Sequence, residues 1–443
     1  MKTAILTCAV LSLMVGCKDS KLDTDTKSWS QPEIISNSRD SLSTDFSLQK
    51  WNNTLIAFNE DGRGFTTYVF QENEMTWDER RVNQSNWLPL DCSAIKNRVI
   101  ISRGTVTQHQ LDLRFISGSI TEAGTLSLGE QVRLSETTES LFAPKSDLIF
   151  ANASRPLELR FNRSVIKGGN IYVPYSIEAQ PVFVKGQIPD RNSDVNGMFY
   201  SSNSGASWKA IKISDSFSIL PSACATKNYI YYFAADYDRK ELWFSRAGID
   251  SALWSPPQAF CRTLAVAAYR HTYETVGDSD TVHVCWLDSR HERRRANPVY
   301  PGRENYEVAY CHRKDSDASW SKDVILSKGL LYAYSPSISV EGENIVVAWA
   351  GANDKDGHNE FWPNDIYYAI SKDGGNTWTK PVRITEGFKD GITSGRPQVA
   401  LHNGVIHLFY IQGKLNYEEV SAGMVKLNQP PWPIYYTQRP FPN

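Results

Sequence analysis

The chain has 443 residues, and 41% of them are hydrophobic, which is enough to bury a large core. Its 27 glycines and 21 prolines interrupt many short apolar runs, a pattern that favours strands over helices. The formal net charge is −2, so the sequence lacks the positive field typical of nucleic-acid binding, and no motif indicates a nucleotide, redox cofactor or metal.

The first predicted element is a signal peptide at residues 1–16. Lys2 precedes an apolar run from Ala4 to Gly16, which is too short to span a bilayer but suits a signal-peptide core. The ending "MVGC" resembles the lipobox of bacterial lipoproteins, which implies cleavage before Cys17 and attachment of lipid to that residue. An ordinary signal peptide with a chance cysteine is the alternative.

A polar stretch follows the lipobox, and we expect residues 17–26 to form a lipidated, disordered tether. Several acyl chains together anchor a protein stably to a membrane. The lipobox resemblance therefore implies a location in the bacterial cell envelope, either periplasmic or exposed at the surface. No later segment is long and apolar enough to cross a membrane.

The remaining cysteines show no CxxC pair, so a zinc site is not expected. They are Cys92, Cys224, Cys261, Cys285 and Cys311. Cys285 and Cys311 fall on strands that we expect to be neighbours. The sequence leaves two readings open for this pair, a disulfide or two buried free thiols.

A short turn sequence recurs along the chain. It reads "SKDGGNTW" at 371–378, "SSNSGASW" at 201–208 and "RKDSDASW" at 313–320, where Asp317 stands in the glycine position. We expect the Asp or Asn side chain to accept hydrogen bonds from nearby backbone N–H groups, the glycine to adopt a positive φ, and the tryptophan to pack between units. The residues with these structural roles are Asn203, Gly205, Trp208, Asp315, Trp320, Asp373, Gly375 and Trp378.

These turns match the Asp-box, S/T-x-D/N-x-G-x-S/T-W, and the chain therefore resembles the sialidase-like β-propellers, also described as BNR-repeat proteins. Short strands flank each turn and give four strands per unit. Seven units begin near Phe46, Cys92, Leu157, Leu220, Leu264, Pro336 and Pro397. We predict an all-β fold with one seven-bladed β-propeller over residues 27–443; sialidases have six blades, and a six-bladed ring is the alternative.

The last unit ends without its outer strand. The stretch "KSWSQPEIIS" at 27–36 reads like "NTWTKPVRIT" at 376–385, which forms the outer strand of the preceding unit. We therefore predict that the N-terminal strand completes the C-terminal blade and closes the ring, so that no sheet edge is left bare.

Candidate binding residues lie in or near loops on the face opposite the Asp-box turns. The loop at 288–305 contains five arginines, and guanidinium groups pair with carboxylates and sulfates. Asp288 and Arg290 come directly after a strand, near the expected funnel, and Asp288 is expected to orient Arg290 by an ion pair. Asp288 and His291 are the candidate catalytic groups. A solvated charge run is the alternative for Arg293–Arg295.

Three other arginines are candidate ligands for an anionic substrate. Arg63, in "TLIAFNEDGR", matches by resemblance the second arginine of the sialidase carboxylate-binding triad. Arg155 and Arg396 each precede a proline, which we expect to fix an extended entry into the innermost strand and to direct the arginine to the central cavity. Either can instead form a structural salt bridge.

The departures from the sialidase pattern are specific. Ser43 stands where a sialidase has its first arginine, and "GFTTYVF" after Arg63 lacks the acid–base aspartate. An active exo-sialidase is therefore not expected. We expect a monomer that binds an anionic oligo- or polysaccharide, either as a glycosidase or lyase or as a non-catalytic glycan- or protein-binding propeller, without cofactor, metal or nucleic acid.

The lipobox leads to a direct test. Replacing Cys17 by Ser removes the acceptor of the lipid, so we expect the protein to move from the membrane fraction to the soluble fraction. Acyl-label incorporation followed by fractionation measures this. A wild-type protein that takes up no acyl label would contradict the assignment.

Overall fold

The computed structural model describes residues 23–24, 29–36, 46–51, 54–60, 65–71, 76–82, 91–95, 98–107, 110–120, 126–133, 158–161, 165–178, 195–203, 205–214, 219–236, 239–249, 251, 253–265, 272–290, 306–353, 364–386, 392–414 and 433–442. Every regular element among these residues is a β-strand. The predicted all-β fold class is therefore confirmed.

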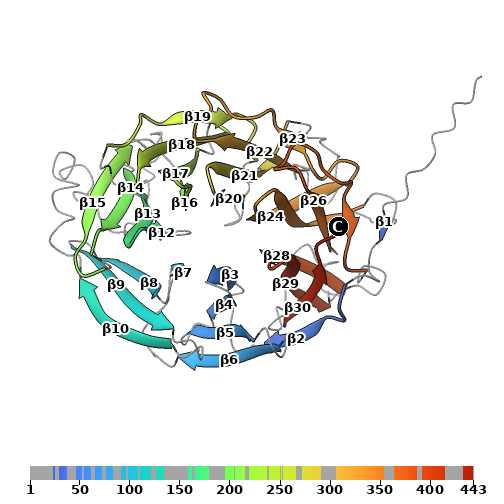
Figure 1. The fold of residues 1–443 in the computed structure, drawn as a ribbon, viewed down its shortest axis with the longest axis horizontal. Coiled ribbons are helices and arrows are strands. Elements are labelled where there is room, and N and C mark those ends of the chain that lie inside the picture. Colours follow the sequence, from blue (N-terminus) through green and yellow to red (C-terminus); the bar gives the residue numbers. More distant parts are fainter. Residues whose placement is uncertain are drawn as a thin grey trace, which may run out of the picture.

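The described strands form seven sheets, which we number as blades 1 to 7 in chain order, and Figure 1 shows them side by side around a ring. Blade 1 consists of β3 (Phe46–Trp51), β4 (Thr54–Glu60), β5 (Phe65–Gln71) and β6 (Thr76–Val82). Blade 2 consists of β7 (Asp91–Ile95), β8 (Arg98–Thr107), β9 (Gln110–Ile120) and β10 (Leu126–Arg133). Blade 3 consists of β11 (Glu158–Phe161), β12 (Val165–Lys167), β13 (Asn170–Glu178), β14 (Val195–Ser201) and β15 (Lys209–Ser214).

Blade 4 consists of β16 (Ile219–Ala225), β17 (Tyr229–Asp236), β18 (Glu241–Gly248) and β19 (Gln258–Cys261). Blade 5 consists of β20 (Tyr273–Asp278), β21 (Thr281–Asp288), β22 (Glu307–Lys314) and β23 (Val324–Ile325). Blade 6 consists of β24 (Tyr332–Glu341), β25 (Asn344–Ala352), β26 (Asp365–Ser371), β27 (Val382–Arg383) and the short β1 (Asp23–Thr24). Blade 7 consists of β28 (Ile392–His402), β29 (Val405–Lys414), β30 (Ile434–Pro440) and β2 (Glu33–Ser36).

The antiparallel strands of each blade end on two opposite faces of the ring. In blade 5 the β20–β21 hairpin and the turn after β22 lie on one face, which we call the turn face. Asp288, at the end of β21, and Glu307, at the start of β22, are paired on the other face, which we call the loop face. The loop at 288–305 therefore begins and ends on the loop face.

The two turns with complete Asp-box sequences make the hydrogen bonds expected of them. Asp373 Oδ1 accepts a hydrogen bond from the backbone N–H of Thr377 at 2.8 Å, and Trp378 Nε1 donates to the Gly375 carbonyl at 3.1 Å. Gly375 has a φ of +93°, a conformation that side chains other than glycine resist. The same set of contacts recurs in the other turn, among Asn203, Gly205, Ser207 and Trp208.

A tryptophan in or just before the outermost strand of a blade packs against an aromatic residue on the third strand of the preceding blade. This contact recurs in four blades of the described chain, with ring-centroid distances of 4.7 Å for Trp378–Tyr310, 5.3 Å for Trp320–Phe244, 5.3 Å for Trp77–Tyr436 and 5.4 Å for Trp29–Tyr368. The glycine of the turn is part of the same contact, because a Cβ at Gly375 would lie 2.1 Å from Tyr310 Oη.

The N-terminal strand β2 pairs antiparallel with β30, as the outermost strand of blade 7. The Ser30 N–H donates to the Gln438 carbonyl at 2.8 Å, and the buried Trp29 packs on Tyr368 of blade 6. Arg439 lies over the rings of both Trp29 and Tyr368. Residues near the two chain ends thus share one blade, which Figure 1 shows between β28–β30 and β2.

Two residues of the expected disordered tether are ordered. Asp23 and Thr24 form β1, which runs parallel to β27 at the outer edge of blade 6. The expectation of disorder is therefore wrong for these two residues, because their backbone groups pair with a strand edge that would otherwise lack a partner. Cys17 and the predicted signal peptide lie outside the described residues.

The innermost strands contain a recurrent irregularity at an X–Pro step. The register shifts between Ile219 and Ser222 in blade 4, between Tyr334 and Ser337 in blade 6 and between Gly395 and Gln398 in blade 7. A proline cannot donate to the ladder, so it is accommodated at a bulge. The predicted start at Leu264 is also displaced, since β20 begins at Tyr273 and Leu264 forms only an isolated bridge with Asp288.

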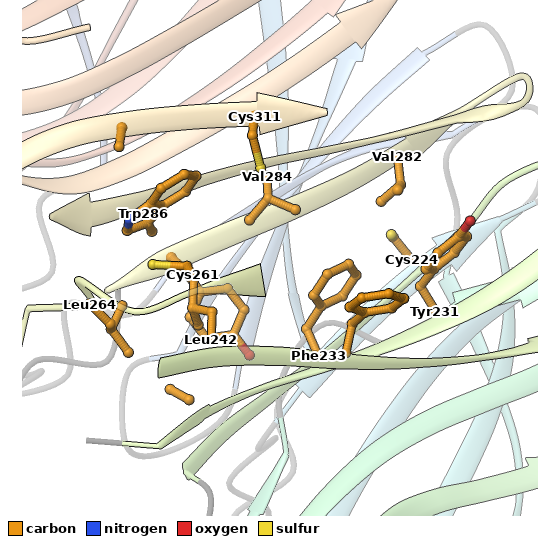
Figure 2. Packing of buried hydrophobic residues seen from close by; sticks show 14 residues of the cluster. Cys224, Tyr231, Phe233, Leu242, Cys261, Leu264, Val282, Val284, Trp286 and Cys311 are labelled. Carbon is orange, nitrogen blue, oxygen red and sulfur yellow. The ribbon is translucent and has the colours of Figure 1, made fainter. Parts of the chain in front are cut away.

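Cys285 and Cys311 are both buried free thiols, so the disulfide reading is wrong. The two residues lie on adjacent strands, but Cys311 pairs with Val284 and Cys285 with Tyr310, which directs their side chains to opposite faces of blade 5. Figure 2 shows Cys311 among the apolar side chains between blades 4 and 5, whereas Cys285 packs on the blade 6 side.

Two blades contain a buried histidine–tyrosine pair at the same position. His283 Nδ1 lies 2.7 Å from Tyr310 Oη, and His407 Nδ1 lies 2.9 Å from Tyr436 Oη. Burial lowers the pKa of both histidines to about 3. Both side chains are therefore neutral in the folded protein at neutral pH and remain so well below it.

Ring closure by β2 can be tested by deletion. A chain that begins at Asn37 lacks both β2 and Trp29, which exposes the β30 edge and removes one contact between blades. We expect aggregation or a large fall in melting temperature, measured by thermal unfolding. Unchanged unfolding of this truncated chain would contradict the closure.

The buried histidines predict acid sensitivity. A histidine in the unfolded chain has a pKa of about 6.5, so it takes up a proton below that pH, whereas the buried histidines of the folded chain do not. The free energy of unfolding therefore decreases as the pH is lowered from about 6.5 to about 3. We expect each histidine to lower the free energy of unfolding by about 2 kcal/mol between pH 7.5 and pH 5, measured by urea unfolding. The double variant His283→Gln/His407→Gln should lose most of this dependence, and equal slopes in the two proteins would refute it.

Candidate functional site

A cavity of about 370 Å³ lies between the outer strands of blades 4 and 5. Figure 2 shows Cys261, Trp286 and Cys311, which line it from β19, β21 and β22 respectively. The complete lining consists of Ala259, Phe260, Cys261, Arg262, Thr263, Trp286, Arg290, Cys311, Trp320, Ser321 and Asp323. The cavity therefore combines aromatic rings with charged and hydroxyl groups.

The aromatic part of the cavity is built around Trp320. This residue stacks on Phe260 with a centroid distance of 4.3 Å, and Trp286 meets Phe260 edge to face at 6.3 Å. Trp320 belongs to the blade 5 turn and Phe260 to β19 of blade 4, so the contact between the two blades also forms a wall of the cavity.

Among the three turns at 201–208, 313–320 and 371–378, the blade 5 turn is the one that departs from the Asp-box sequence. Asp317 replaces the glycine, and Arg313 donates to the Asp317 carbonyl at 2.9 and 3.2 Å. The Asp315 carboxylate accepts hydrogen bonds from blade 4, namely from Thr226, Asn228 and Tyr231. Asp315 therefore joins two blades on the turn face instead of closing its own turn.

The charged corner of the cavity is centred on Arg290. Its Nε and Nη2 donate to the two oxygens of Asp288 at 2.9 and 2.6 Å, so the ion pair expected from the sequence is present. The same Nη2 forms an ion pair with Asp323, which directly precedes β23. These hydrogen bonds raise the pKa of Arg290 further above its usual range, so the guanidinium is permanently charged.

Asp288 is a fully buried carboxylate that positions Arg290. Besides the side-chain bonds it accepts the Arg290 backbone N–H at 2.9 Å, the Thr263 hydroxyl at 2.5 Å and Trp286 Nε1 at 3.1 Å. Burial pushes its pKa up, but the hydrogen bonds from Arg290 and Thr263 outweigh burial and hold the pKa below its usual value. A carboxylate so fully engaged is not suited to act as a general acid, although the sequence made it a catalytic candidate.

The two thiols of the cavity are unreactive in this environment. Burial raises the pKa of Cys261 to about 11, and it raises the pKa of Cys311 well above its usual value. Both remain protonated at neutral pH, and nucleophilic catalysis requires the thiolate. Neither cysteine therefore supplies a nucleophile to the cavity.

An acid followed by an arginine recurs at the loop face of blade 4. Asp236 ends β17, and Arg239 pairs with it at 3.7 Å, much as Arg290 pairs with Asp288 at the end of β21. The "NEDGR" stretch that ends in Arg63 has the same order of residues at the end of β4. In the two blades where the structure describes this order, the arginine forms an ion pair with its own strand-end acid.

The arginines chosen from the sequence are not all brought together by the described structure. Arg290 lies at the cavity between blades 4 and 5, whereas Arg396 lies in β28 of blade 7. Arg396 has a φ of +49°, so the expected extended entry before Pro397 is wrong, because the chain forms a bulge there. Arg63, Arg155 and His291 lie outside the described residues.

Sequence reasoning missed Phe260, Thr263, Trp286 and Asp323 as lining residues. Phe260 and Thr263 come from the end of blade 4, whereas Trp286 and Asp323 come from blade 5. Only the packing of the two blades brings them together. The one available signal was Asp323, an acid directly before an outer strand in "SKDVILSK".

The described residues show no group of three or more His, Cys, Asp or Glu side chains that could hold a metal ion. In the same part of the chain, no helix has the length and apolar character of a membrane span.

Comparison with known proteins finds similarity to solved sialidase structures from Trypanosoma rangeli. The sialidase in complex with sialic acid shares 12% identity over 94% of this chain and 57% of its own, with a TM-score of 0.46. A mutant of the same enzyme with trans-sialidase activity shares 11% identity over 90% of this chain and 55% of its own, with a TM-score of 0.44. This chain thus spans little more than half the length of those proteins.

No family model matches the chain, and no curated protein sequence matches it. At these identities a structural similarity concerns the fold alone. The chain's own strand pairing shows the all-β fold, with seven described sheets placed around a ring as the Asp-box turns predicted.

Proposed function

We propose that the protein is a lipid-anchored propeller of the bacterial cell envelope that binds a carbohydrate in the cavity between blades 4 and 5. The observation that carries this proposal is the composition of the cavity, in which Phe260 and Trp320 form an aromatic wall beside Arg290 and Asp323. Sites for small ligands typically combine such apolar surfaces with a few well-placed polar groups. The proposed anchor is the lipid on Cys17.

The cavity is also large enough for a sugar residue together with part of its neighbour. Its volume of about 370 Å³ lies within the usual range for ligand sites, roughly 300–1,000 Å³. Ser321 and Thr263 add hydroxyl groups to its lining, which suit the hydroxyls of a sugar. We infer that one or two sugar units enter it.

An anionic sugar is the proposed ligand. Arg262 lines the cavity with a side chain that is 80% exposed, and the nearest acid paired with it is Glu241 at 3.5 Å. Guanidinium groups recognise carboxylate and sulfate through paired N–H bonds.

The acidic side chains near the cavity favour binding of a glycan over its cleavage. Glycoside hydrolysis usually requires two carboxyl groups that face the scissile bond. Asp323 is the one acid among the described lining residues, and the neighbouring Asp288 is fully buried, does not line the cavity and is occupied by hydrogen bonds. A non-catalytic glycan-binding protein therefore fits the described residues better than a glycosidase or lyase.

A glycan array with neutral, carboxylated and sulfated oligosaccharides tests the proposal, followed by titration of the best binder. We expect Arg262→Ala to weaken binding of an anionic glycan roughly tenfold, because one charge-assisted contact is lost. Arg290→Lys keeps the positive charge beside the buried Asp288 but removes the planar guanidinium group with its several N–H donors. This variant should weaken binding by a similar factor.

Arg239→Ala is the matched control, because Arg239 occupies the equivalent corner of blade 4, pairs with Asp236 and does not line the cavity. We expect this variant to bind like the wild type. A protein that binds no carbohydrate on the array, or an Arg239 variant that loses as much affinity as the Arg262 variant, would overturn the proposal.

A further inference from the structure

The ion pair between Arg290 and Asp323 has a consequence for which ligands the cavity accepts. Arg290 is held on one edge by Asp288, through its Nε and Nη2 atoms. The same Nη2 atom also meets Asp323. One guanidinium therefore faces two carboxylates before any ligand arrives.

The two carboxylates are not equivalent. Asp288 is fully buried and fixed by Thr263 and Trp286 as well as by Arg290. Asp323 has a side chain that is 29% exposed and lines the cavity. Asp288 is thus a permanent part of the framework, whereas Asp323 has its Oδ2 buried against Arg290 and the rest of its side chain partly exposed in the cavity lining, where a ligand can reach it.

We propose that Asp323 is a specificity-determining residue, which occupies the Arg290 donor that the anionic group of a ligand would otherwise take. This inference rests on the proposed carbohydrate site. A ligand carboxylate that approaches Arg290 must displace Asp323 or lie against it, and two like charges in contact repel each other. A neutral sugar hydroxyl meets no such opposition, because it donates to Asp323 and accepts from Arg290.

The cavity therefore discriminates between charged and uncharged groups at the position beside Arg290. Anionic groups of the ligand are directed instead to Arg262, a lining residue whose side chain is far more exposed than that of Arg290. The ligand class that fits this arrangement is an acidic oligosaccharide in which a neutral unit enters the cavity and a carboxylated or sulfated unit remains outside.

The test uses Asp323→Asn, which removes the charge and keeps the size of the side chain. The probes are a tetrasaccharide of alternating N-acetylglucosamine and glucuronate and its carboxyl-reduced form, in which each glucuronate has become glucose. Isothermal titration gives the ratio of the two affinities for each protein. We expect Asp323→Asn to shift this ratio toward the carboxylated probe by about tenfold or more, because Arg290 then becomes available to it.

Asp323→Glu restores the charge and should return the ratio toward the wild-type value. Asp280→Asn, an exposed acid of the same blade at the β20–β21 turn, should leave the ratio unchanged. A merely structural role for Asp323 would lower the melting temperature of the Asn variant without changing the ratio, and that result would overturn the inference. Binding of neither probe by any of these proteins would overturn the carbohydrate site itself together with the inference.

Discussion

The contact on which the ring depends is the packing of one tryptophan against the third strand of the preceding blade. An antiparallel blade has two faces, and each face must be covered by a neighbour for the core to exclude water. The tryptophan beside the outermost strand packs on this neighbour, as Trp378 packs on Tyr310 and Trp29 packs on Tyr368. Aromatic pairs of this kind stabilise a fold by roughly 0.5–1.5 kcal/mol beyond the area they bury. In the described chain, one repeated element therefore joins neighbouring blades at four places.

Blades 4 and 5 use the same contact, but its surroundings differ. Trp320 packs on Phe244 and Phe260 as expected, yet the turn has lost its glycine, and Asp315 reaches the neighbouring blade on the turn face. On the loop face, Asp288 accepts the Thr263 hydroxyl and so joins the same two blades. The blades are thus held at both faces, and the cavity lies between these two attachments, where the packing at the outer strands is incomplete.

The fold could be predicted from the sequence because the motifs that indicate it are local. Each Asp-box brings its acid, glycine and tryptophan together within eight residues, and the match between residues 27–36 and 376–385 indicated which strand completes blade 7. The site was readable only in part. Asp288 and Arg290 lie two positions apart, so their pairing could be predicted, whereas Asp323 is distant in the sequence and comes from the segment before the outer strand β23.

The two predictions that were wrong, at Cys285/Cys311 and at Arg396, failed for the same reason. Cys285 and Cys311 were possible partners because their strands are neighbours, but a strand alternates its side chains between two faces, and the register directs these two apart. Arg396 was expected to be extended because a proline follows it, yet the bulge in β28 places it at a positive φ. In both positions the pairing of strands distant in the sequence decided the outcome, and residue spacing carries no information about that pairing.

The tryptophan between blades 4 and 5 has a second role as a cavity wall, besides the contact between blades that it shares with its equivalents. The most direct measurement compares Trp320→Ala with Trp378→Ala, by titration with the best glycan ligand at a temperature where both variants remain folded. Both variants should be destabilised by roughly 3 kcal/mol, the usual effect of truncating a packed tryptophan. We expect the Trp378 variant to keep the wild-type affinity, whereas the Trp320 variant should lose at least tenfold. Equal affinities in the two variants would contradict this second role of Trp320.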